Sequence, residues 1–198
     1  MLSSIHPLGE RAKRNRFAVT ATAFAVGATL GGLVLGTVAG LVGLAVRSGL
    51  GEGAALAVLA VVALVAASFE WRGRALPSIP RQVDENWLNE YRGWVYGGGF
   101  GFQLGAGVLT YITSAAVYVT IISAVLVGHL LAAMAIGATF GLVRGLTLVP
   151  ARAITNAGTL VSFHRRLADT AGTVRTVSTS AIVVIGLVAA VHSIQELS

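Results

Sequence analysis

The sequence predicts an all-helical membrane protein, a bundle of about five transmembrane helices in one domain that covers residues 1–198. Only 11% of the 198 residues are charged and 55% are hydrophobic, whereas a soluble domain carries about 25% charged residues. The charges are also unevenly spread, because four stretches of 30, 17, 51 and 20 residues contain no Asp, Glu, Lys or Arg. A helix needs roughly 20 apolar residues to cross a bilayer, so these stretches predict the spans.

The spans are placed at the uncharged stretches in turn. The first follows a basic tail and is too long for a cleaved signal peptide, whose apolar region has about 7–15 residues. The 51-residue stretch has to fold as a hairpin, with a polar break at Gly128 and His129. A moderately apolar segment, 149–163, is either an interfacial helix or a sixth, shallow span. The predicted spans are 18–44, 53–70, 96–125, 128–147 and 176–195.

The basic residues predict the orientation. They gather in the opening tail, in segment 71–95 and in segment 144–175, and only Arg47 lies elsewhere. With five spans and a cytoplasmic N-terminus, 13 of the 14 basic residues fall on the cytoplasmic side, as the positive-inside rule expects. The composition favours a bacterial protein, so we expect the plasma (inner) membrane. A basic surface that faces anionic lipid explains the net charge of +6 without any nucleic-acid partner.

The loop between the second and third spans has a pattern of its own. Pro77 and Pro80 end the preceding helix, and Asp84 is a suitable N-cap for a new one. Aromatic and apolar side chains then recur at helical spacing, and Trp and Tyr are enriched at membrane interfaces. We predict an interfacial helix over about 84–95; the functional alternative is a lid over a cytoplasmic opening. The residues of this face are Trp87, Leu88, Tyr91, Trp94 and Val95.

Three runs of glycine at a spacing of four residues predict glycine-zipper packing. Residues four apart share a helix face, and a missing side chain lets two helix backbones approach closely. We expect tight packing inside one chain, or a homo-oligomer or hetero-complex that uses one of these faces. Gly97 and the two glycines after it offer an alternative, a hinge in a broken helix. The runs are Gly32, Gly36 and Gly40; Gly97, Gly101 and Gly105; and Gly137, Gly141 and Gly145.

The third predicted span carries a stripe of uncharged polar side chains on one helix face. Hydroxyl and amide groups suit a neutral or weakly polar solute, or an ion that dipoles dehydrate. The alternative is that they hydrogen-bond to neighbouring helices, each bond contributing about 0.6 kcal/mol. If the protein has a pathway, we expect this helix to line it. The candidate pathway-lining residues are Gln103, Thr110, Tyr111, Ser114 and Tyr118.

The sequence contains no constellation that indicates an enzyme. No predicted span holds paired carboxylates, and no metalloprotease motif, activated nucleophile or phosphate-binding loop is present. The chain has no cysteine, which excludes thiol redox chemistry by this chain alone. His129 and His192 are expected as interfacial histidines near the outer face. We therefore expect no catalytic residue, no metal and no cofactor.

The glycine-rich spans carry a family resemblance. The segment from Gly97 to Tyr118, and to a lesser extent that from Gly27 to Gly40, resembles small bacterial membrane proteins of the DsbD and CcdA type. That family moves electrons through a cysteine in each half, and its halves are inverted three-span units. This chain has no cysteine and five predicted spans, so the resemblance implies a packing style and no functional residue is carried over.

Two functions fit these observations. The leading one is a small transporter or channel-like protein for an unidentified solute, which the polar stripe favours. The alternative is a non-catalytic membrane subunit or scaffold of a larger complex, with the lipid bilayer and a second polypeptide as its partners. The scarcity of charge inside the predicted spans favours the alternative, because ion-coupled transporters usually keep a carboxylate within the membrane.

Overall fold

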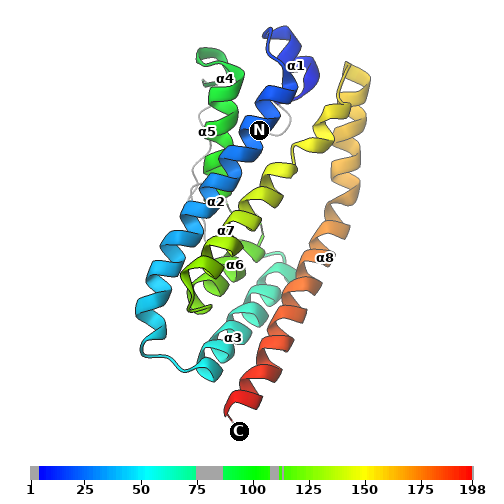
Figure 1. The fold of residues 1–198 in the computed structure, drawn as a ribbon. Coiled ribbons are helices and arrows are strands. Elements are labelled where there is room, and N and C mark those ends of the chain that lie inside the picture. Colours follow the sequence, from blue (N-terminus) through cyan, green and yellow to red (C-terminus); the bar gives the residue numbers. More distant parts are fainter. Residues whose placement is uncertain (1–4, 75–86, 108–111, 113, 198) are drawn as a thin grey trace. The chain divides into compact units, whose positions relative to one another are not determined.

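The computed structural model describes residues 5–74, 87–107, 112 and 114–197, and this part of the chain is helical without any strand. The predicted all-helical fold is therefore confirmed (Figure 1). The elements are α1 (Pro7–Ala12), α2 (Phe17–Arg47), α3 (Glu52–Trp71), α4 (Trp87–Glu90), α5 (Gly93–Gly105), α6 (Ala116–Leu126), α7 (Leu130–Leu146), the 3-10 helix η1 (Val149–Ala153) and α8 (Ala157–Leu197).

Within this described part, four helices are long and apolar enough to cross a membrane, as expected for a membrane protein. Three of them lie where the sequence predicted spans: α2, α3, and the 24-residue stretch Leu130–Ala153 that α7 forms together with η1. The fourth, α8, contains the predicted span 176–195 but begins at Ala157 and has 41 residues. Since a bilayer is crossed by roughly 20 residues, the first half of α8 exceeds that span. The segment 149–163 forms η1 and the start of α8.

The third predicted span, 96–125, is wrong as a single helix. α5 ends at Gly105 and α6 begins at Ala116, and of the residues between them 108–111 and 113 are not described. Gly107 has a φ of +67°, and its N–H donates to the Leu104 carbonyl at 3.1 Å. Glycine adopts this left-handed conformation without steric cost and commonly ends helices. The 13-residue α5 and the 11-residue α6 are each too short to cross a bilayer alone.

The predicted interfacial helix over 84–95 is also wrong as one helix. Its residues 84–86 lie outside the described part, and α4 covers only Trp87–Glu90. Arg92 then adopts an extended conformation, with φ −68° and ψ 153°, and caps the start of α5. Trp94 therefore belongs to α5, where its side chain is exposed. Trp87 packs instead on the Phe100 ring, with the ring centroids 6.1 Å apart.

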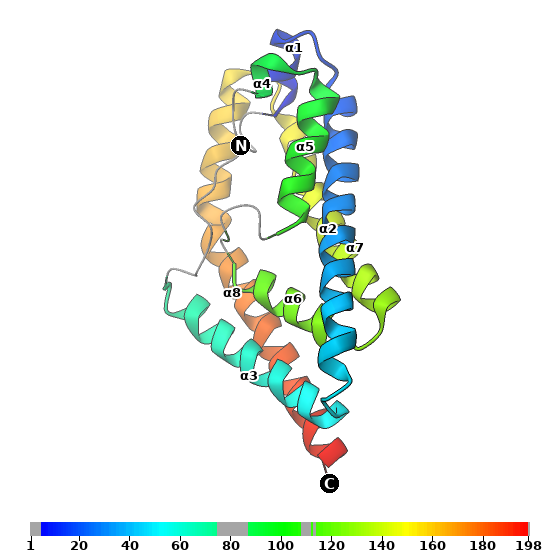
Figure 2. The same ribbon diagram turned by 90° about the vertical axis from the view of Figure 1, so that its left-hand side faces the viewer.

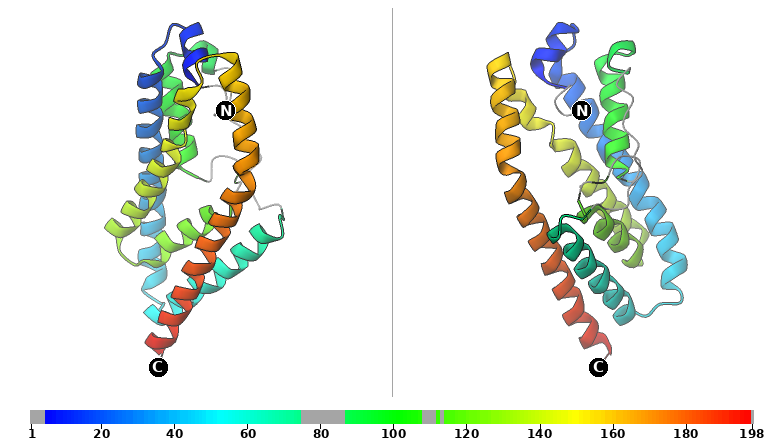
Figure 3. Two further views of the ribbon diagram at one scale, coloured as in Figure 1. Left: turned by 90° about the vertical axis from the view of Figure 1, so that its right-hand side faces the viewer. Right: turned by 180° about the vertical axis from the view of Figure 1, so that it is seen from behind.

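One compact unit contains Met1–Gly32, Ile79–Tyr111 and Ala138–Ala171. In it the first half of α2 runs beside α5, as Figure 2 shows. The chain then turns from the end of α7 through η1 into α8 (Figure 3). A core of mostly large apolar side chains holds these elements together. Wherever a part of the protein would otherwise contact water, the burial of apolar surface is the main stabilising contribution. Its buried members are Ile5, Phe24, Leu88, Tyr96, Phe100, Leu148, Ala151 and Ile154.

The other unit contains Leu33–Ser78, Ile112–Gly137 and Gly172–Ser198. Here α3 and the end of α8 run antiparallel: Ser193 Oγ donates to the Gly53 carbonyl at 2.9 Å, and Arg175 Nη2 donates to the Trp71 carbonyl at 3.1 Å. Small side chains fill the contact between α3, α6 and α8, which lets the helices approach closely. Its buried members are Ala63, Ala66, Ala67, Ala115, Val119 and Ile182.

Candidate functional site

A buried carboxylate lies where α3 ends and α6 begins. Glu70, the next-to-last residue of α3, is 8% exposed. Its Oε2 atom accepts a hydrogen bond from the Ala115 backbone N–H at 2.8 Å. Ser114 Oγ lies 3.2 Å from Oε2 and 3.4 Å from Oε1. Glu70 thus takes the place of an N-cap for α6, and a negative charge there is favoured by the helix dipole.

A third oxygen-bearing side chain, from α8, completes this Glu70 site. Ser178 Oγ lies 3.2 Å from Ser114 Oγ, and either atom can be the donor. Both serines are partly exposed, whereas the carboxylate that they approach is buried. The walls are apolar, because Ala66, Ala67 and Ala115 belong to the same core cluster. The site combines a group that can bind a proton with two hydroxyls that can pass one on.

A second buried carboxylate, Glu10 of α1, belongs to the other unit. Glu10 is 1% exposed. Thr20 Oγ1 of α2 donates to its Oε2 atom at 2.7 Å, and Tyr96 Oη of α5 donates to its Oε1 atom. Thr20 and Tyr96 are as buried as Glu10 itself. The carboxylate therefore joins three helices through neutral donors, in a place that water does not reach.

Two further residues complete the surroundings of Glu10. Asn15 Nδ2 donates to Tyr96 Oη at 3.3 Å. Lys13 Nζ donates to the Leu88 carbonyl at 2.9 Å and lies 5.7 Å from the centre of the Tyr96 ring, within the range of a cation–π interaction. Every side chain of this Glu10 site is thus held by at least one partner, which is what a buried polar group requires.

The sequence did not single out either carboxylate. Glu10 lies in the opening tail, which was considered only for its basic residues, and Glu70 only marked the end of the predicted span 53–70. The partners of Glu70 lie 44 and 45 positions along the chain, so no local spacing reveals them. The one usable signal was that Glu70 ends an uncharged run of 17 residues, since an acid at the edge of a span is costly unless it has a role.

The predicted pathway-lining residues do not share one helix. Gln103 is on α5, Ser114 precedes the first residue of α6 by two positions, and Tyr118 is within α6. Thr110 and Tyr111 lie outside the described residues. The stripe was inferred from continuous helical spacing, and the break after Gly105 removes that basis. Ser114 is nevertheless the predicted residue that contacts the buried Glu70 carboxylate.

The predicted glycine runs lie at helix contacts within each unit. A Cβ atom added to Gly101, Gly105 or Gly141 would overlap a backbone carbonyl of α2, and one added to Gly36 would overlap the Ala133 carbonyl of α7. A Cβ at Gly97, Gly40 or Gly145 would lie 2.7, 2.8 or 2.9 Å from its nearest neighbour. Gly32 and Gly137 are the partners of two of these positions. The Cβ added to Gly141 would lie 3.1 Å from the Gly32 Cα atom, and the Cβ added to Gly36 would lie 3.1 Å from the Gly137 Cα atom. Use of these faces by a second chain stays a prediction.

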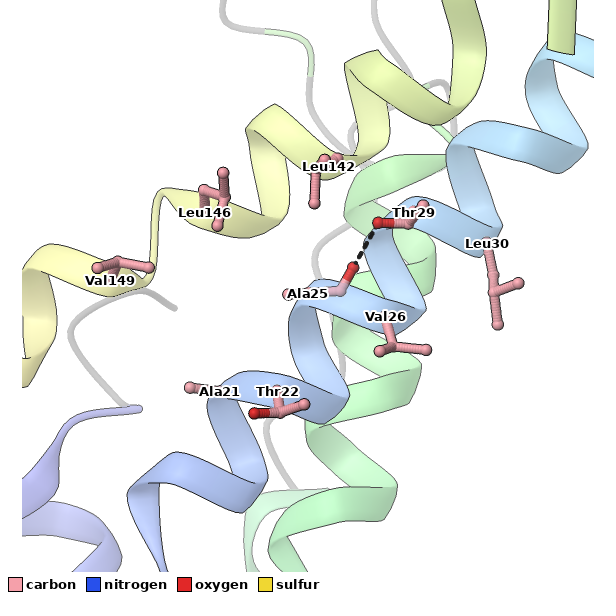
Figure 4. A pocket seen from close by; sticks show the side chains of 9 residues that line it. All are labelled: Ala21, Thr22, Ala25, Val26, Thr29, Leu30, Leu142, Leu146 and Val149. Atoms are coloured by element: carbon pink, nitrogen blue, oxygen red, sulfur yellow. Dashed lines mark hydrogen bonds between the residues drawn. The ribbon is translucent and has the colours of Figure 1, made fainter. Parts of the chain in front are cut away.

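An open apolar groove of about 420 Å³ runs between α2 and the end of α7 (Figure 4). Its polar lining is limited to two threonines, and Thr29 Oγ1 is engaged with the Ala25 carbonyl at 2.9 Å. Such a surface suits a hydrocarbon chain and offers no group for chemistry. The lining residues are Ala21, Thr22, Ala25, Val26, Thr29, Leu30, Leu142, Leu146 and Val149.

Comparison with known proteins finds two curated relatives, each named methylamine utilization protein MauF. The chain is 32% identical to the one from Paracoccus versutus over 152 residues, which are 73% of this chain and 54% of the relative. It is 37% identical to the one from Paracoccus denitrificans over 120 residues, 59% of this chain and 43% of the relative. The chain thus spans about half the length of these relatives. No family model and no solved structure matches it.

These relatives correct the resemblance drawn from the sequence. The chain is similar to proteins named MauF, and the assignment to the DsbD and CcdA type is wrong. That assignment rested on glycine-rich apolar segments, which many tightly packed membrane helices share. Its main segment, from Gly97 to Tyr118, is moreover split between α5 and α6.

Proposed function

We propose that the chain is a membrane accessory protein of methylamine utilization that carries a small polar solute across the plasma membrane, driven by protons that bind Glu70. The names of the two relatives support the metabolic setting. One observation carries the transport role: the buried carboxylate of Glu70 contacts Ser114 and the Ala115 N–H where the expected third span is broken. The orientation that we adopt has the N-terminus in the cytoplasm, as the positive-inside rule favours.

Glu70 has the position that proton coupling needs. Acidic side chains in membrane segments are rare, and they mark proton relays and ion pathways. When the carboxylate takes up a proton it becomes a neutral carboxylic acid, and its attraction to the N-terminal end of α6 is lost. The Ala115 N–H then donates to a neutral carboxylic acid, which is a weaker acceptor than the carboxylate. Proton binding is thereby linked to how firmly α6 packs on α3.

The solute pathway is proposed from the polar residues near this break. Ser114 is shared between the predicted lining set and the Glu70 site, so a solute that displaces Ser114 would also act on the carboxylate. Gln103, Thr110, Tyr111 and Tyr118 remain predicted lining residues. Discontinuous helices are a common way for transporters to build binding sites in the membrane.

Flux into liposomes tests the proposal. The probe is labelled methylammonium at acidic pH, where the cation predominates and passive crossing of the free base is slow. Wild-type vesicles with an imposed proton gradient should take up more label than protein-free vesicles. Glu70→Gln should lose this gradient-driven uptake by about tenfold or more, the effect of about 1.4 kcal/mol on a barrier. Glu52→Gln is the matched control, because Glu52 lies on the same helix and is exposed.

Two results would count against the proposal. Equal uptake by wild-type and protein-free vesicles would contradict transport of this solute. Equal uptake by Glu70→Gln and wild type, with the Glu52→Gln control also normal, would contradict the role of Glu70. Because both variants replace a carboxylate with an amide of the same shape, a general loss of folding should be recognised from expression and from the helical circular dichroism signal.

A role as a non-catalytic subunit is the second proposal. It is favoured by the first half of α8, where residues 164–177 are exposed without interruption. Arg165, Arg166 and Arg175 make this stretch basic, and exposed basic surfaces recognise acidic partners. Native mass spectrometry of the protein extracted from its own membrane separates the two proposals. A stable complex with a different polypeptide would favour the subunit, and a chain without a companion would favour transport.

A further inference from the structure

The segment of residues 5–15 lies against the start of α2 and α5 through a few specific contacts. α1 has only six residues, which is too short for an independently stable helix. Ile5, at 1% exposure, anchors one end of the segment in the apolar core. Glu10 anchors its middle through Thr20 and Tyr96, and Lys13 anchors its other end through the Leu88 carbonyl. Asn15 adds a hydrogen bond from its Nδ2 atom to Tyr96 Oη at 3.3 Å, so a small number of side chains hold the segment in place.

The turn that joins α1 to α2 is strained. Arg14 has a φ of +57°, a left-handed conformation that is unfavourable for a residue with a side chain. The Asn15 N–H closes the turn by donating to the Glu10 carbonyl at 2.8 Å. This hydrogen bond is typical of a helix C-terminus at which the left-handed residue, here Arg14, is usually a glycine. Detachment of the segment would release this strain, so the attached state is maintained against it.

A histidine sits at the start of the segment, among groups whose charge depends on pH. His6 is 8% exposed, and its Nδ1 atom accepts a hydrogen bond from the Gly9 N–H at 3.1 Å. Burial lowers the pKa of His6; Glu10 on the same helix acts to raise it, and His164 on α8 acts to lower it. A proton on Nδ1 would also remove the acceptor that caps α1. The detached segment therefore binds a proton more readily than the attached one.

We propose that residues 5–15 form a latch that closes over the first turns of α2 and α5 at neutral pH and detaches in acid. The direction of this pH effect follows from proton linkage, because the state that binds more protons is favoured as the pH falls. The closed latch is fully favoured above the ordinary pKa of histidine and weakens as the pH falls below it. The groups that face Glu10 and His6 are Tyr96 from α5, Lys13 from the segment itself and His164 from α8. Opening exposes Tyr96 and Thr20.

Hydrogen exchange of the wild-type protein in lipid nanodiscs measures the latch without any substitution. Exchange is compared at about pH 8 and about pH 5.5, the range in which histidine changes charge, and is corrected for the intrinsic pH dependence of amide exchange. Backbone amides of residues 8–15 should lose protection several-fold in acid. Amides of residues 182–193 on α8, which lie in the other unit, should keep theirs.

Three variants make the test specific. His6→Asn keeps an acceptor for the Gly9 N–H but cannot titrate, so the latch should stay closed in acid. Glu10→Ala should open the latch at both pH values, because it leaves the Thr20 and Tyr96 hydroxyls without their shared acceptor, whereas Glu90→Ala on the exposed part of α4 should change nothing. Arg14→Gly should close the latch further by relieving the turn. Unchanged wild-type protection in acid, or a full pH response in His6→Asn, would overturn the proposal.

Discussion

Glu10 and Glu70 are both buried glutamates, yet they are held in opposite ways. Glu10 is 1% exposed and both of its oxygens accept from hydroxyls, Thr20 and Tyr96, that are equally buried. Glu70 is 8% exposed and shares its oxygens between one backbone N–H and a partly exposed serine. A sealed and fully paired carboxylate fixes structure, whereas a carboxylate that reaches partly exposed hydroxyls can exchange a proton. The same side chain therefore fixes structure in one unit and, in the function that we propose, binds a proton in the other.

The largest expected effect comes from removing the two carboxylates in turn. Glu10→Ala leaves the Tyr96 and Thr20 hydroxyls buried without their acceptor, which should cost about 2–6 kcal/mol at about 1–3 kcal/mol for each group. Glu70→Ala leaves one buried N–H, that of Ala115, and should cost about 1–3 kcal/mol. Hydrogen exchange of each unit's own peptides measures the two losses separately. Equal losses of stability in the two variants would mean that the two carboxylates stabilise their units to the same extent.

The next effect concerns how tightly the Glu10 site is packed. A Cβ atom added to Gly93 would overlap Thr20 Oγ1 and lie 3.1 Å from Glu10 Oε2. Gly93→Ala should therefore destabilise this unit by about 1–3 kcal/mol, the usual cost of overpacking. Gly98→Ala on the same helix is the matched control, because its added Cβ meets nothing closer than the Ala23 carbonyl at 3.8 Å. Thermal unfolding followed by circular dichroism compares them, and equal melting temperatures would contradict the tight packing.

Composition predicted those features that depend on bulk hydrophobicity. The uncharged stretches correctly located α2, α3 and α7, because a long apolar run has few other stable structures. The end of α5 was missed, since it is decided by the backbone conformation of Gly107, which no charge or apolar period reports. The early start of α8 at Ala157 was missed for the opposite reason: its charged first half is helical without being a span.

The candidate site was predicted only at Ser114. Its selection rested on a helical stripe that the structure breaks, yet the residue does contact Glu70. Glu70, Ala115 and Ser178 meet from three helices, so their convergence is a property of the tertiary fold. Glu10 was not singled out, because its partner Tyr96 is 86 positions away. Pairs so distant carry no signal in a single sequence.

The smallest expected effect separates the two sites most sharply. Ser178→Ala removes a partner of Ser114 but leaves both Glu70 hydrogen bonds in place, so it should cost only about 0.6 kcal/mol. Ser180→Ala, exposed on the same helix, should cost less still. Hydrogen exchange of α6 amides measures both changes. A loss well above about 1.7 kcal/mol for Ser178→Ala would exceed the largest bond of this kind in a membrane. It would mean that Ser178 seals the Glu70 site, which would then be a structural anchor like that of Glu10.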